Sequence, residues 1–549
     1  MAELLTPLAL IFIVAAIFLL VATRFGIPAV PVYIITGMAL APFVPEGTTL
    51  ELAQWGIAFL VFAFGVEVDP KRFRAVARDS EHVAAGQVLL VGGLVYALGR
   101  LLGLDSLNAV YFASAAALSS SLVGRELALH DIRSNLVQGR LISSVHFVQD
   151  LFAVVLILVL SAEAFTPDGI ALKLGYGVVI LIVAALVRVY LFDLLVSLSG
   201  DSDELVILTG VALLLGFISL AEFTGVSIVV GAFAAGLAVT REFPGKLALE
   251  AGLESFDDFF AAVFFVTLGS LVAVPSPRVL ALAGVLVLAI VVLKPLVTIY
   301  ALLYQGYEPR TASLTSFGLD QVSEFALIIA IQALVLGRIQ EALFEAIILV
   351  AAVTMVTSTV TRQYGDDLYR LLGRVVPLQS SHAKLEARSA VDPELRDHVV
   401  VVGYGRLGTL AARTCEAEGQ PFVVVEHDPD RHRLATEHEN HLFGDAVSES
   451  TWDRVNVDNA KLILSTVSDE RISRQILDLE TDADVVLRAG RVDESVELLE
   501  RGADYVLVPD FLASERLLEK IRAILDEHAT PDEVRSQNAR RLDVETEFR

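Results

Sequence analysis

The chain has 549 residues, of which 55% are hydrophobic and only 19% are charged. A soluble protein of this size would carry about 25% charged residues. The apolar residues are gathered into stretches of 17–25 residues between positions 4 and 364. Because a bilayer core needs about 20 apolar residues per helix, this part is predicted to be an integral membrane protein. Glu3 stands where a signal peptide has a basic leader, so residues 4–22 are predicted to be a first span.

The net charge of −25 is uneven, because 36 acidic and 21 basic residues lie between positions 381 and 549. This balance argues against nucleic acid as a partner, since nothing there neutralises phosphates. Lysine is rare, with 7 Lys against 34 Arg. An acidic, lysine-poor surface suits high salt, so we expect a halophilic source; a GC-rich genome that favours Arg codons is the alternative. The single cysteine, Cys415, excludes an internal disulfide.

Thirteen candidate membrane spans follow one another in a domain that we place at residues 1–365. They lie at about 4–22, 27–45, 51–68, 81–102, 107–124, 137–162, 169–195, 203–222, 226–240, 256–275, 278–304, 312–336 and 341–361. Alternate loops hold 14 Lys or Arg residues, and the opposite loops hold 4. Because Lys and Arg stay in the cytoplasm, we expect a multi-pass cell-membrane protein with its N-terminus outside and its C-terminal domain in the cytoplasm.

The span at 137–162 carries three polar side chains, His146, Gln149 and Asp150. A charge at the bilayer centre costs at least about 2.5–3.5 kcal/mol, so an acid there is a functional-site hypothesis. Asp150 can bind a monovalent cation when it is ionised and a proton when it is neutral. One such group is the least that cation/proton exchange requires. The alternative is a structural acid. His146 lies one turn earlier and is interpreted as a helix-packing donor, with an ion or proton ligand as the alternative; Gln149 offers a neutral carbonyl oxygen.

Two further spans are interrupted by polar residues. The first, at 107–124, contains three adjacent hydroxyls that can satisfy backbone groups freed by a break in the helix. The second, at 312–336, is too polar for a simple lipid-facing helix. Paired broken spans point to a midplane site between inverted repeats, so spans 4–6 and 11–13 are expected to correspond. The predicted ion or proton ligands are Asp150, Gln149, Ser119, Ser120, Ser121, Asp320, Glu324 and His146.

Two other features belong to the same membrane domain. The segment at 261–271 contains no Lys or Arg and is expected to flank the site. Lys294 stands before Pro295 in the eleventh span. It either pairs with an acid or extends to the membrane surface, and the sequence leaves this choice open.

The pattern changes after a polar linker at 366–396, which includes an amphipathic stretch, LYRLLGRVV. Runs of four or five valines indicate parallel strands buried on both faces. Further strand candidates alternate with helical patterns up to residue 520. Residues 397–520 are therefore predicted to form an α/β doubly wound, Rossmann-like domain. Residues 521–549 are predicted to be an acidic tail.

A GxGxxG motif, Gly403, Gly405 and Gly408, lies between a strand and a helix, and Glu426 ends the next strand. The glycines make the turn, admit a phosphate and let the helix pack, while the acid accepts the ribose hydroxyls. An empty Rossmann-like pocket is the alternative. Too few residues follow position 520 for a substrate domain, so the nucleotide is interpreted as a regulator and the chain is not expected to be an enzyme.

The other predicted nucleotide contacts surround these residues. Arg406 is interpreted either as a phosphate ligand or as a solvated loop charge. Asp445 is expected to line the adenine side, with a helix N-cap as the alternative. The complete predicted set is Gly403, Gly405, Arg406, Leu407, Gly408, Glu426, His427, Asp445 and Ala446.

The motifs ALSSSLVG, HFVQDLFAV, FFVTLGSL, LKPLVTIYALL and SEFALIIA come in an order that resembles the Kef-type monovalent cation:proton antiporters of the cation:proton antiporter-2 family. VVVVGYGRLG, VVVEHDPD and FGDA resemble the cytosolic RCK, or TrkA-N, nucleotide-binding domain fused to that branch. This resemblance implies a homodimer with elevator-like alternating access and crossed, unwound helices. It also implies NAD(H) or an adenine nucleotide (AMP, ADP or ATP) as the regulatory ligand.

The resemblance places the ion-binding acid at Asp150. The pair Gln149–Asp150 resembles members that carry potassium, and a single titrating carboxylate implies electroneutral K⁺/H⁺ exchange. The alternative is a Na⁺/H⁺ antiporter of the same fold. It stays open because Asp320 and Gln321 replace the glycine- and serine-rich residues usual in the family, and an added acid can change ion selectivity. An RCK-regulated channel is disfavoured, since VVGYG at 401–405 lies in the soluble domain and no other string resembles a carbonyl filter.

Overall fold

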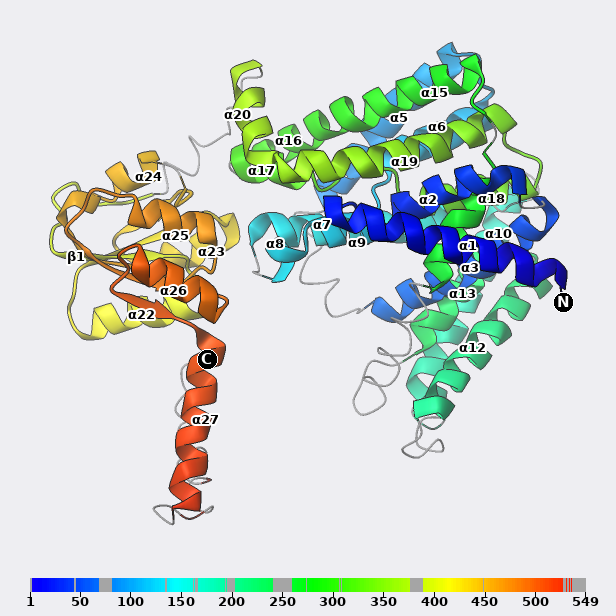
Figure 1. Cartoon of the computed structure of the whole chain (residues 1–549). Coiled ribbons are helices and arrows are strands. Elements are labelled where there is room, and N and C mark those ends of the chain that lie inside the picture. Colours follow the sequence, from blue (N-terminus) through cyan, green and yellow to red (C-terminus); the bar gives the residue numbers. More distant parts are fainter. Residues whose placement is uncertain are drawn as a thin grey trace. The chain divides into compact units, whose positions relative to one another are not determined.

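Figure 1 shows the computed structural model of the chain. The structure describes residues 2–43, 46–68, 81–133, 136–160, 162, 166–192, 194, 203–239, 259–272, 274–305, 307, 309–375, 389–447, 449–526, 530, 533 and 535. These residues belong to two compact units, one within Met1–Gln305 and Pro309–Leu378 and the other within Gly306–Glu308 and Gln379–Arg549. The basic loops predicted at 71–78 and 241–246, part of the linker and most of the acidic tail lie outside the described residues.

The first unit is helical throughout its described part. Its helices are α1 Ala2–Ala22, α2 Ala29–Leu40, α3 Glu46–Glu67, a helix over Glu81–Leu101 that includes α5 Gly92–Leu101, α6 Ser106–Ala117, α7 Ser121–Leu127, α8 Leu129–Arg133, α9 Val137–Leu160, α10 Pro167–Leu186, α12 Asp203–Phe223, α13 Ile228–Ala238, a helix over Phe259–Ser270, α15 Pro277–Leu288, α16 Lys294–Gln305, α17 Pro309–Ser316, α18 Glu324–Val335, α19 Glu341–Gln363 and α20 Gly365–Val375.

Among the described residues, six helical segments are long and apolar enough to cross a membrane, and seven shorter helices are also apolar. Each of the thirteen predicted spans corresponds to one of these segments. The expectation of a polytopic helical membrane domain is therefore confirmed. The amphipathic stretch in the predicted linker forms α20, whose last turn carries Arg374.

Two close helix crossings reveal the repeated architecture. A Cβ atom on Gly37 of α2 would overlap the backbone of the helix over Phe259–Ser270, and one on Gly269 would overlap the backbone of α2. Gly65 of α3 and Gly236 of α13 meet in the same way. Small residues let membrane helices approach this closely. The first crossing joins spans 2 and 10, and the second joins spans 3 and 9. If each span corresponds to the one seven positions later, span 2 matches span 9 and span 3 matches span 10, so the two crossings are equivalent.

The same offset of seven spans relates two pairs of irregular helices, whereas a further π-helical turn, at Val187–Leu191 in the seventh span, has no counterpart among the thirteen spans. A π-helical turn at Gln87–Val91 interrupts the fourth span, and another at Ala289–Leu293 interrupts the eleventh. The fifth span breaks between α6 and α7, and the twelfth breaks between α17 and α18. The predicted correspondence of spans 4–6 and 11–13, with one broken helix in each set, agrees with this arrangement.

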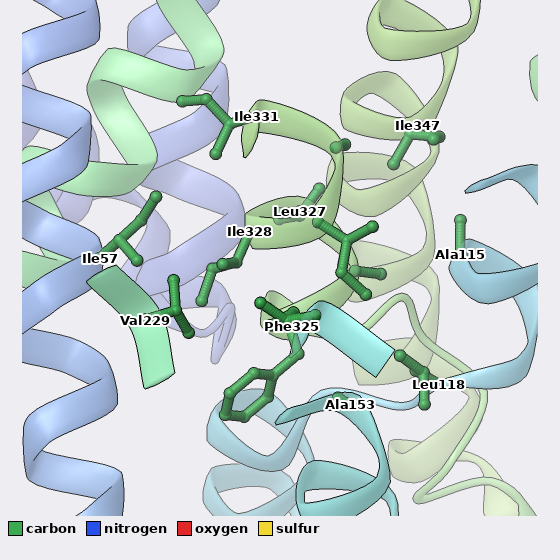
Figure 2. Packing of buried hydrophobic residues seen from close by; sticks show 14 of the residues in the cluster. Ile57, Ala115, Leu118, Ala153, Val229, Phe325, Leu327, Ile328, Ile331 and Ile347 are labelled. Carbon is green, nitrogen blue, oxygen red and sulfur yellow. The ribbon is translucent and has the colours of Figure 1, made fainter. Parts of the chain in front are cut away.

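Helix α18 lies in the middle of the apolar core (Figure 2). Phe325, Leu327, Ile328 and Ile331 are all buried, and their neighbours in the same core cluster include residues of α3, α13, α6 and α19. Because every residue of α18 from Glu324 to Ile331 is buried, neighbouring helices rather than lipid surround this part of the helix. The core therefore fixes the position of the helix that begins at the second break.

The second unit is built on six parallel strands in the order β3-β2-β1-β4-β5-β6. Their bounds are β1 His398–Val402, β2 Phe422–Glu426, β3 His441–Phe443, β4 Ala460–Ser465, β5 Asp484–Arg488 and β6 Tyr505–Leu507. The helices are α22 Arg406–Ala417, α23 Pro429–Ala435, α24 Glu449–Arg454, α25 Glu470–Leu477, α26 Val492–Glu500 and α27 Pro509–Leu525. This is the doubly wound Rossmann order, so the predicted fold class is confirmed.

The α/β unit also includes the segment at residues 389–395, which precedes β1. Ala390 and His441 exchange backbone hydrogen bonds of 3.0 and 2.7 Å, and the Ser389 hydroxyl accepts a hydrogen bond from the backbone N–H of Phe443. Leu395 is buried in the core of the sheet. Residues 389–395, which the sequence places in the linker, therefore pack with the α/β unit.

His398 gives the α/β unit a predictable pH dependence. It begins β1, is fully buried, and its Nε2 lies 2.9 Å from the carbonyl oxygen of Val455. Burial lowers the pKa of His398 below its ordinary value of 6.5, so the unfolded chain binds a proton that the folded unit does not. The stability contributed by neutral His398 is therefore present above pH 6.5 and is lost as the pH falls through the lowered pKa.

We expect the opening free energy of the β1 amides to fall as the pH is lowered below 6.5. Hydrogen exchange on the full-length protein, corrected for the intrinsic exchange rate, measures this quantity. His398→Gln should flatten the slope. An equal slope in the wild type and the variant would show that another group titrates.

Candidate ion-binding and nucleotide-binding sites

Each broken span is capped by serine at its break. Helix α6 ends at Ala117, and the Ser120 hydroxyl accepts a hydrogen bond of 3.2 Å from the backbone N–H of Val123 in α7. At the second break, the Ser323 hydroxyl accepts one of 3.0 Å from the backbone N–H of Phe325. Serine is a favoured N-cap because its oxygen satisfies a backbone donor at the start of a helix. Both half-helices therefore begin with a satisfied N–H group inside the membrane unit.

The two breaks contact each other, although they are 200 residues apart in the sequence. The Ser119 hydroxyl donates to the carbonyl oxygen of Leu319 at 2.9 Å. The Gln321 side chain donates to the carbonyl oxygen of Ser120 at 3.2 Å. All four residues are buried, so the structure brings the predicted serines and the predicted polar stretch of the twelfth span into one interior site.

One buried acid lies at the positive ends of both half-helices. Glu324 is the first residue of α18, and its Oε1 accepts hydrogen bonds from the Ser121 hydroxyl at 2.5 Å and from the backbone N–H of Leu122 at 3.2 Å. Helix N-termini carry a partial positive charge that a carboxylate stabilises. The geometry thus gives Glu324 a role in neutralising the ends of α7 and α18.

One buried base lies at the carbonyl ends of the same breaks. The Lys294 ammonium is fully buried and donates to the carbonyl oxygens of Leu118 at 2.7 Å and Gln321 at 3.2 Å. A cation stabilises the negative end of a helix. The question that the sequence left open is answered in part, because Lys294 does not extend to the membrane surface.

Helix α9 docks on the first break through Gln149. Its side-chain oxygen accepts a hydrogen bond of 2.9 Å from the backbone N–H of Ser119, and its side-chain nitrogen lies 3.3 Å from the carbonyl oxygen of Ala117. The next residue, Asp150, is only 2% exposed. Asp150 therefore lies in the protein interior, on the helix that contacts the break, and not against lipid.

His146 lies one turn before Asp150 and is also buried. A Cβ atom on Gly124 of α7 would overlap the imidazole ring, so glycine is what allows α7 and α9 to approach here. Among the described residues, neither ring nitrogen has a hydrogen-bond partner. The structure shows the packing expected of His146 but not the hydrogen bond expected of a packing donor.

Asp320 is buried on the second break and is tied to α19. The Thr361 hydroxyl donates to Asp320 Oδ2 at 2.7 Å. The next residue, Arg362, forms an ion pair with Asp131 of α8. The contact with Thr361 fixes this additional acid against the last turns of α19.

Two polar residues in the same interior were missed by the sequence reasoning. Gln87 is fully buried; its side-chain oxygen accepts a hydrogen bond from the side-chain nitrogen of Gln149, and its own nitrogen donates to the Thr298 hydroxyl at 2.6 Å. The signal was a single glutamine in an otherwise apolar span. The segment predicted to flank the site approaches α2 at Gly269 and α3 at Phe264.

The glycine turn of the α/β unit has the geometry that its motif predicts. Gly403 has φ +87°, which favours glycine. A Cβ atom on Gly408 would overlap the carbonyl oxygen of Gly403, so only glycine lets α22 pack on the turn. Gly405 is the N-cap of α22, and Leu407 lies in its first turn. The loop thus presents a helix N-terminus where a phosphate would bind.

Glu426 ends β2 beside this turn, as predicted, but its carboxylate contacts the backbone. Its oxygens accept hydrogen bonds from the N–H groups of Tyr404 at 2.7 Å, His427 at 2.9 Å and Asp428 at 2.9 Å. Each carboxylate oxygen has more than one acceptor site, so a ribose hydroxyl can still be accommodated. The N–H groups of the glycine turn and of the β2 terminus hold this acid in place.

Two arginines border the turn. Arg406 opens α22 and is exposed. The sequence reasoning did not single out Arg431. Its Nη1 lies 3.3 Å from the position that a Cβ atom on Gly405 would take. Its guanidinium group also forms an ion pair of 3.7 Å with Asp428. A guanidinium group beside a helix N-terminus increases the positive potential available to a phosphate.

Asp445 and Ala446 follow β3, the strand next to β2. Asp445 Oδ1 accepts a hydrogen bond of 3.0 Å from the backbone N–H of Val447, so its side chain closes a turn before α24. The carbonyl oxygen of Ala446 accepts one of 2.9 Å from the Trp452 ring. Because parallel strands end at the same edge of a sheet, Asp445 lies on the same side of the unit as Glu426.

Two crossed, interrupted helices with their ends neutralised inside a membrane unit define a secondary transporter. The chain belongs to the sodium/hydrogen exchanger family, whose transmembrane model matches residues 9–363. Residues 399–509 match the TrkA-N domain. The protein is therefore a cation:proton antiporter, not an enzyme, and it carries an additional α/β domain.

Relatives support this assignment over nearly the whole chain. The glutathione-regulated potassium-efflux system protein KefC of Salmonella schwarzengrund is 27% identical over 543 residues, covering 93% of this chain and 83% of the relative. The putative K(+) efflux antiporter KefB of Alkalimonas amylolytica is 27% identical over 532 residues, covering 92% and 79%. The sodium proton antiporter MjNhaP1 of Methanocaldococcus jannaschii has the same membrane fold, with 14% identity, a TM-score of 0.50, and coverage of 67% of this chain and 97% of that one.

We expect Lys294→Met to destabilise the membrane unit, because it removes two charge-assisted hydrogen bonds to carbonyl oxygens in the breaks. The loss should be about 1–3 kcal/mol and should lower the unfolding temperature of the protein in detergent. Lys173→Met is the matched control, since Lys173 also donates to a carbonyl oxygen, that of Gly225, but at another place in the membrane unit. Equal effects of the two substitutions would contradict a special role for Lys294 at the breaks.

Proposed function

We propose that the chain is an electroneutral K⁺/H⁺ antiporter that binds cation and proton alternately at Asp150 and is regulated by a nucleotide on its α/β domain. The observation that supports this proposal best is the burial of Asp150, 2% exposed, directly after the residue that docks α9 on the first break. A buried carboxylate on a helix that contacts a broken helix can exchange a dehydrated cation for a proton.

The buried charged neighbours favour Asp150 as the exchanging group. Glu324 accepts hydrogen bonds from the Ser121 hydroxyl and the N–H of Leu122, and Asp320 accepts one from Thr361. Lys294 donates to the carbonyl oxygens of Leu118 and Gln321. With one exchanging carboxylate, one cation replaces one proton, and the net charge moved in a complete cycle is zero.

Neutral oxygens complete the proposed cation site. Gln149 Oε1 accepts one hydrogen bond, from Ser119, and a carbonyl oxygen has a second lone pair. Carbonyl, hydroxyl and carboxylate oxygens are the ligands that replace the water shell of an alkali cation. Alternating access would then carry the loaded site between the two membrane faces.

Potassium is proposed as the cation because the KefC and KefB relatives are named for potassium efflux and because Gln, rather than a second acid, precedes Asp150. Sodium is the second candidate. The observation in its favour is Asp320, an additional acid buried on the second break. Parallel titrations of proton flux with K⁺ and Na⁺ distinguish the two ions.

The α/β domain is proposed to bind NAD(H) or an adenine nucleotide. Gly403, Gly405 and the N-terminus of α22 would hold the phosphates, Glu426 the ribose and Asp445 the adenine side. The basic loops favour a cytoplasmic position for this domain and an N-terminus outside. A homodimer is proposed from the family resemblance.

We expect Asp150→Asn to abolish cation-driven proton flux, because an amide can neither release a proton nor neutralise a cation. Flux of purified protein in liposomes, followed with an internal pH dye, measures the loss. Glu345→Gln is the matched control: Glu345 is a second acid buried in a membrane helix, α19, and it has no role in this proposal. Flux that persists in Asp150→Asn would refute the proposed role of Asp150 as the carrier of the ion and proton.

Gly405→Val should weaken nucleotide binding at least about tenfold, because its branched side chain occupies the place where a phosphate approaches the backbone. Calorimetry on the full-length protein with NADH and with AMP measures the change. Gly490→Val, at the end of β5, is the control, since a Cβ atom there meets nothing nearer than Glu494 at 3.8 Å. Unchanged affinity in Gly405→Val, with intact folding, would place the nucleotide elsewhere.

A further inference from the structure

A continuous line of buried polar side chains connects the eleventh span to the first break. The Thr298 hydroxyl donates to the carbonyl oxygen of Lys294 at 2.8 Å, and Gln87 Nε2 donates to Thr298 at 2.6 Å. Gln149 Nε2 donates to Gln87 Oε1, and Gln149 Oε1 accepts from the N–H of Ser119 at 2.9 Å. The side chains of Thr298, Gln87 and Gln149 are at most 1% exposed.

The groups at the first break determine which way the Gln149 amide points. A backbone N–H such as that of Ser119 can only donate, and a carbonyl such as that of Ala117 can only accept. Gln149 must therefore turn its oxygen toward Ser119 and its nitrogen toward Ala117 and Gln87. The oxygen and nitrogen of a side-chain amide can normally be assigned in two ways. Here the hydrogen-bond partners allow only one of them.

Gln87 is held in the complementary orientation. Because Gln149 presents an N–H group, Gln87 must present its oxygen, and its own nitrogen then faces Thr298. The Thr298 hydroxyl uses its proton on the carbonyl oxygen of Lys294 and so accepts from Gln87. Reversing either amide would bring two donors or two acceptors together, which is costly in a buried site.

We propose that Gln87 is a positioning residue for cation binding: its Oε1 adds a hydrogen bond to the amide that Ser119 and Ala117 orient, and so holds Gln149 where the second lone pair of its Oε1 is available to the cation beside Asp150. This inference rests on the antiport function proposed above. Gln87 itself does not contact the ion. Its effect is to hold a neutral oxygen ligand without adding a charge or a titrating group next to the carboxylate.

The position of Gln87 in the repeat supports this role. Gln87 begins the π-helical turn of the fourth span, and Lys294 directly follows the π-helical turn of the eleventh. Single π-helical turns occur frequently at functional sites. The two repeat-related spans thus each place one buried polar side chain at a π-helical turn: Lys294 donates to the breaks directly, and Gln87 contacts the first break through Gln149.

The test measures proton flux in liposomes as a function of K⁺ and Na⁺ concentration. Gln87→Met keeps the length of the side chain and removes both hydrogen bonds. The cation KM is expected to rise about tenfold, which corresponds to about 1.4 kcal/mol, while the maximal rate stays within about twofold.

Gln332→Met is the matched control, because Gln332 of α18 is hydrogen-bonded to Ser227 at 2.7 Å, outside this line of side chains. Its KM should not change. If Gln87→Met does not assemble, Thr298→Val removes the anchor of Gln87 and should raise KM in the same direction. An unchanged KM, or an equal fall of rate with no change in KM, overturns the role of Gln87 while leaving the antiport intact. Flux that does not depend on Asp150 overturns the proposed function instead.

Discussion

The structure of the membrane unit depends on satisfying backbone groups where two helices are interrupted away from water. An unpaired N–H or C=O group costs several kcal/mol in such surroundings. Glu324 accepts from the N-terminus of α7 while beginning α18, and Lys294 donates to carbonyl oxygens in both breaks. These two side chains, of opposite charge, make the crossing of the broken helices possible.

The proposed mechanism reserves a single acid, Asp150, for transport. Glu324 and Lys294 have hydrogen-bond partners within the crossing, and Asp320 has one on α19. In the proposed mechanism these residues stabilise the site, and Asp150 carries the exchange. Helix α9 is held at the first break by Gln149. In this account, structural charges and the exchanging charge belong to different residues, so a change at Asp150 between proton and cation leaves the scaffold in place.

Much of this fold could be predicted from the sequence, because long apolar stretches, valine runs and the glycine motif each report a local physical requirement. The serines of the fifth span could be expected at one site with Asp320 and Glu324 of the twelfth span, because each group lies in a polar interruption of an otherwise apolar span. The contact of Lys294 with the breaks could not be predicted, since it joins residues 27 and 176 positions apart. Gln87 was missed for the same reason: one polar residue in an apolar span has no pattern until its partners, Gln149 and Thr298, are known.

The central claim is that one carboxyl group exchanges one cation for one proton. The most direct measurement is the number of protons released per cation bound by the purified protein, obtained by calorimetry in buffers of different ionisation enthalpy near the pH of half-maximal transport. The account predicts that release approaches one proton per cation as the pH is lowered, and that Asp150→Asn releases none. Cation binding without proton release at every pH, or a release close to two, would contradict it.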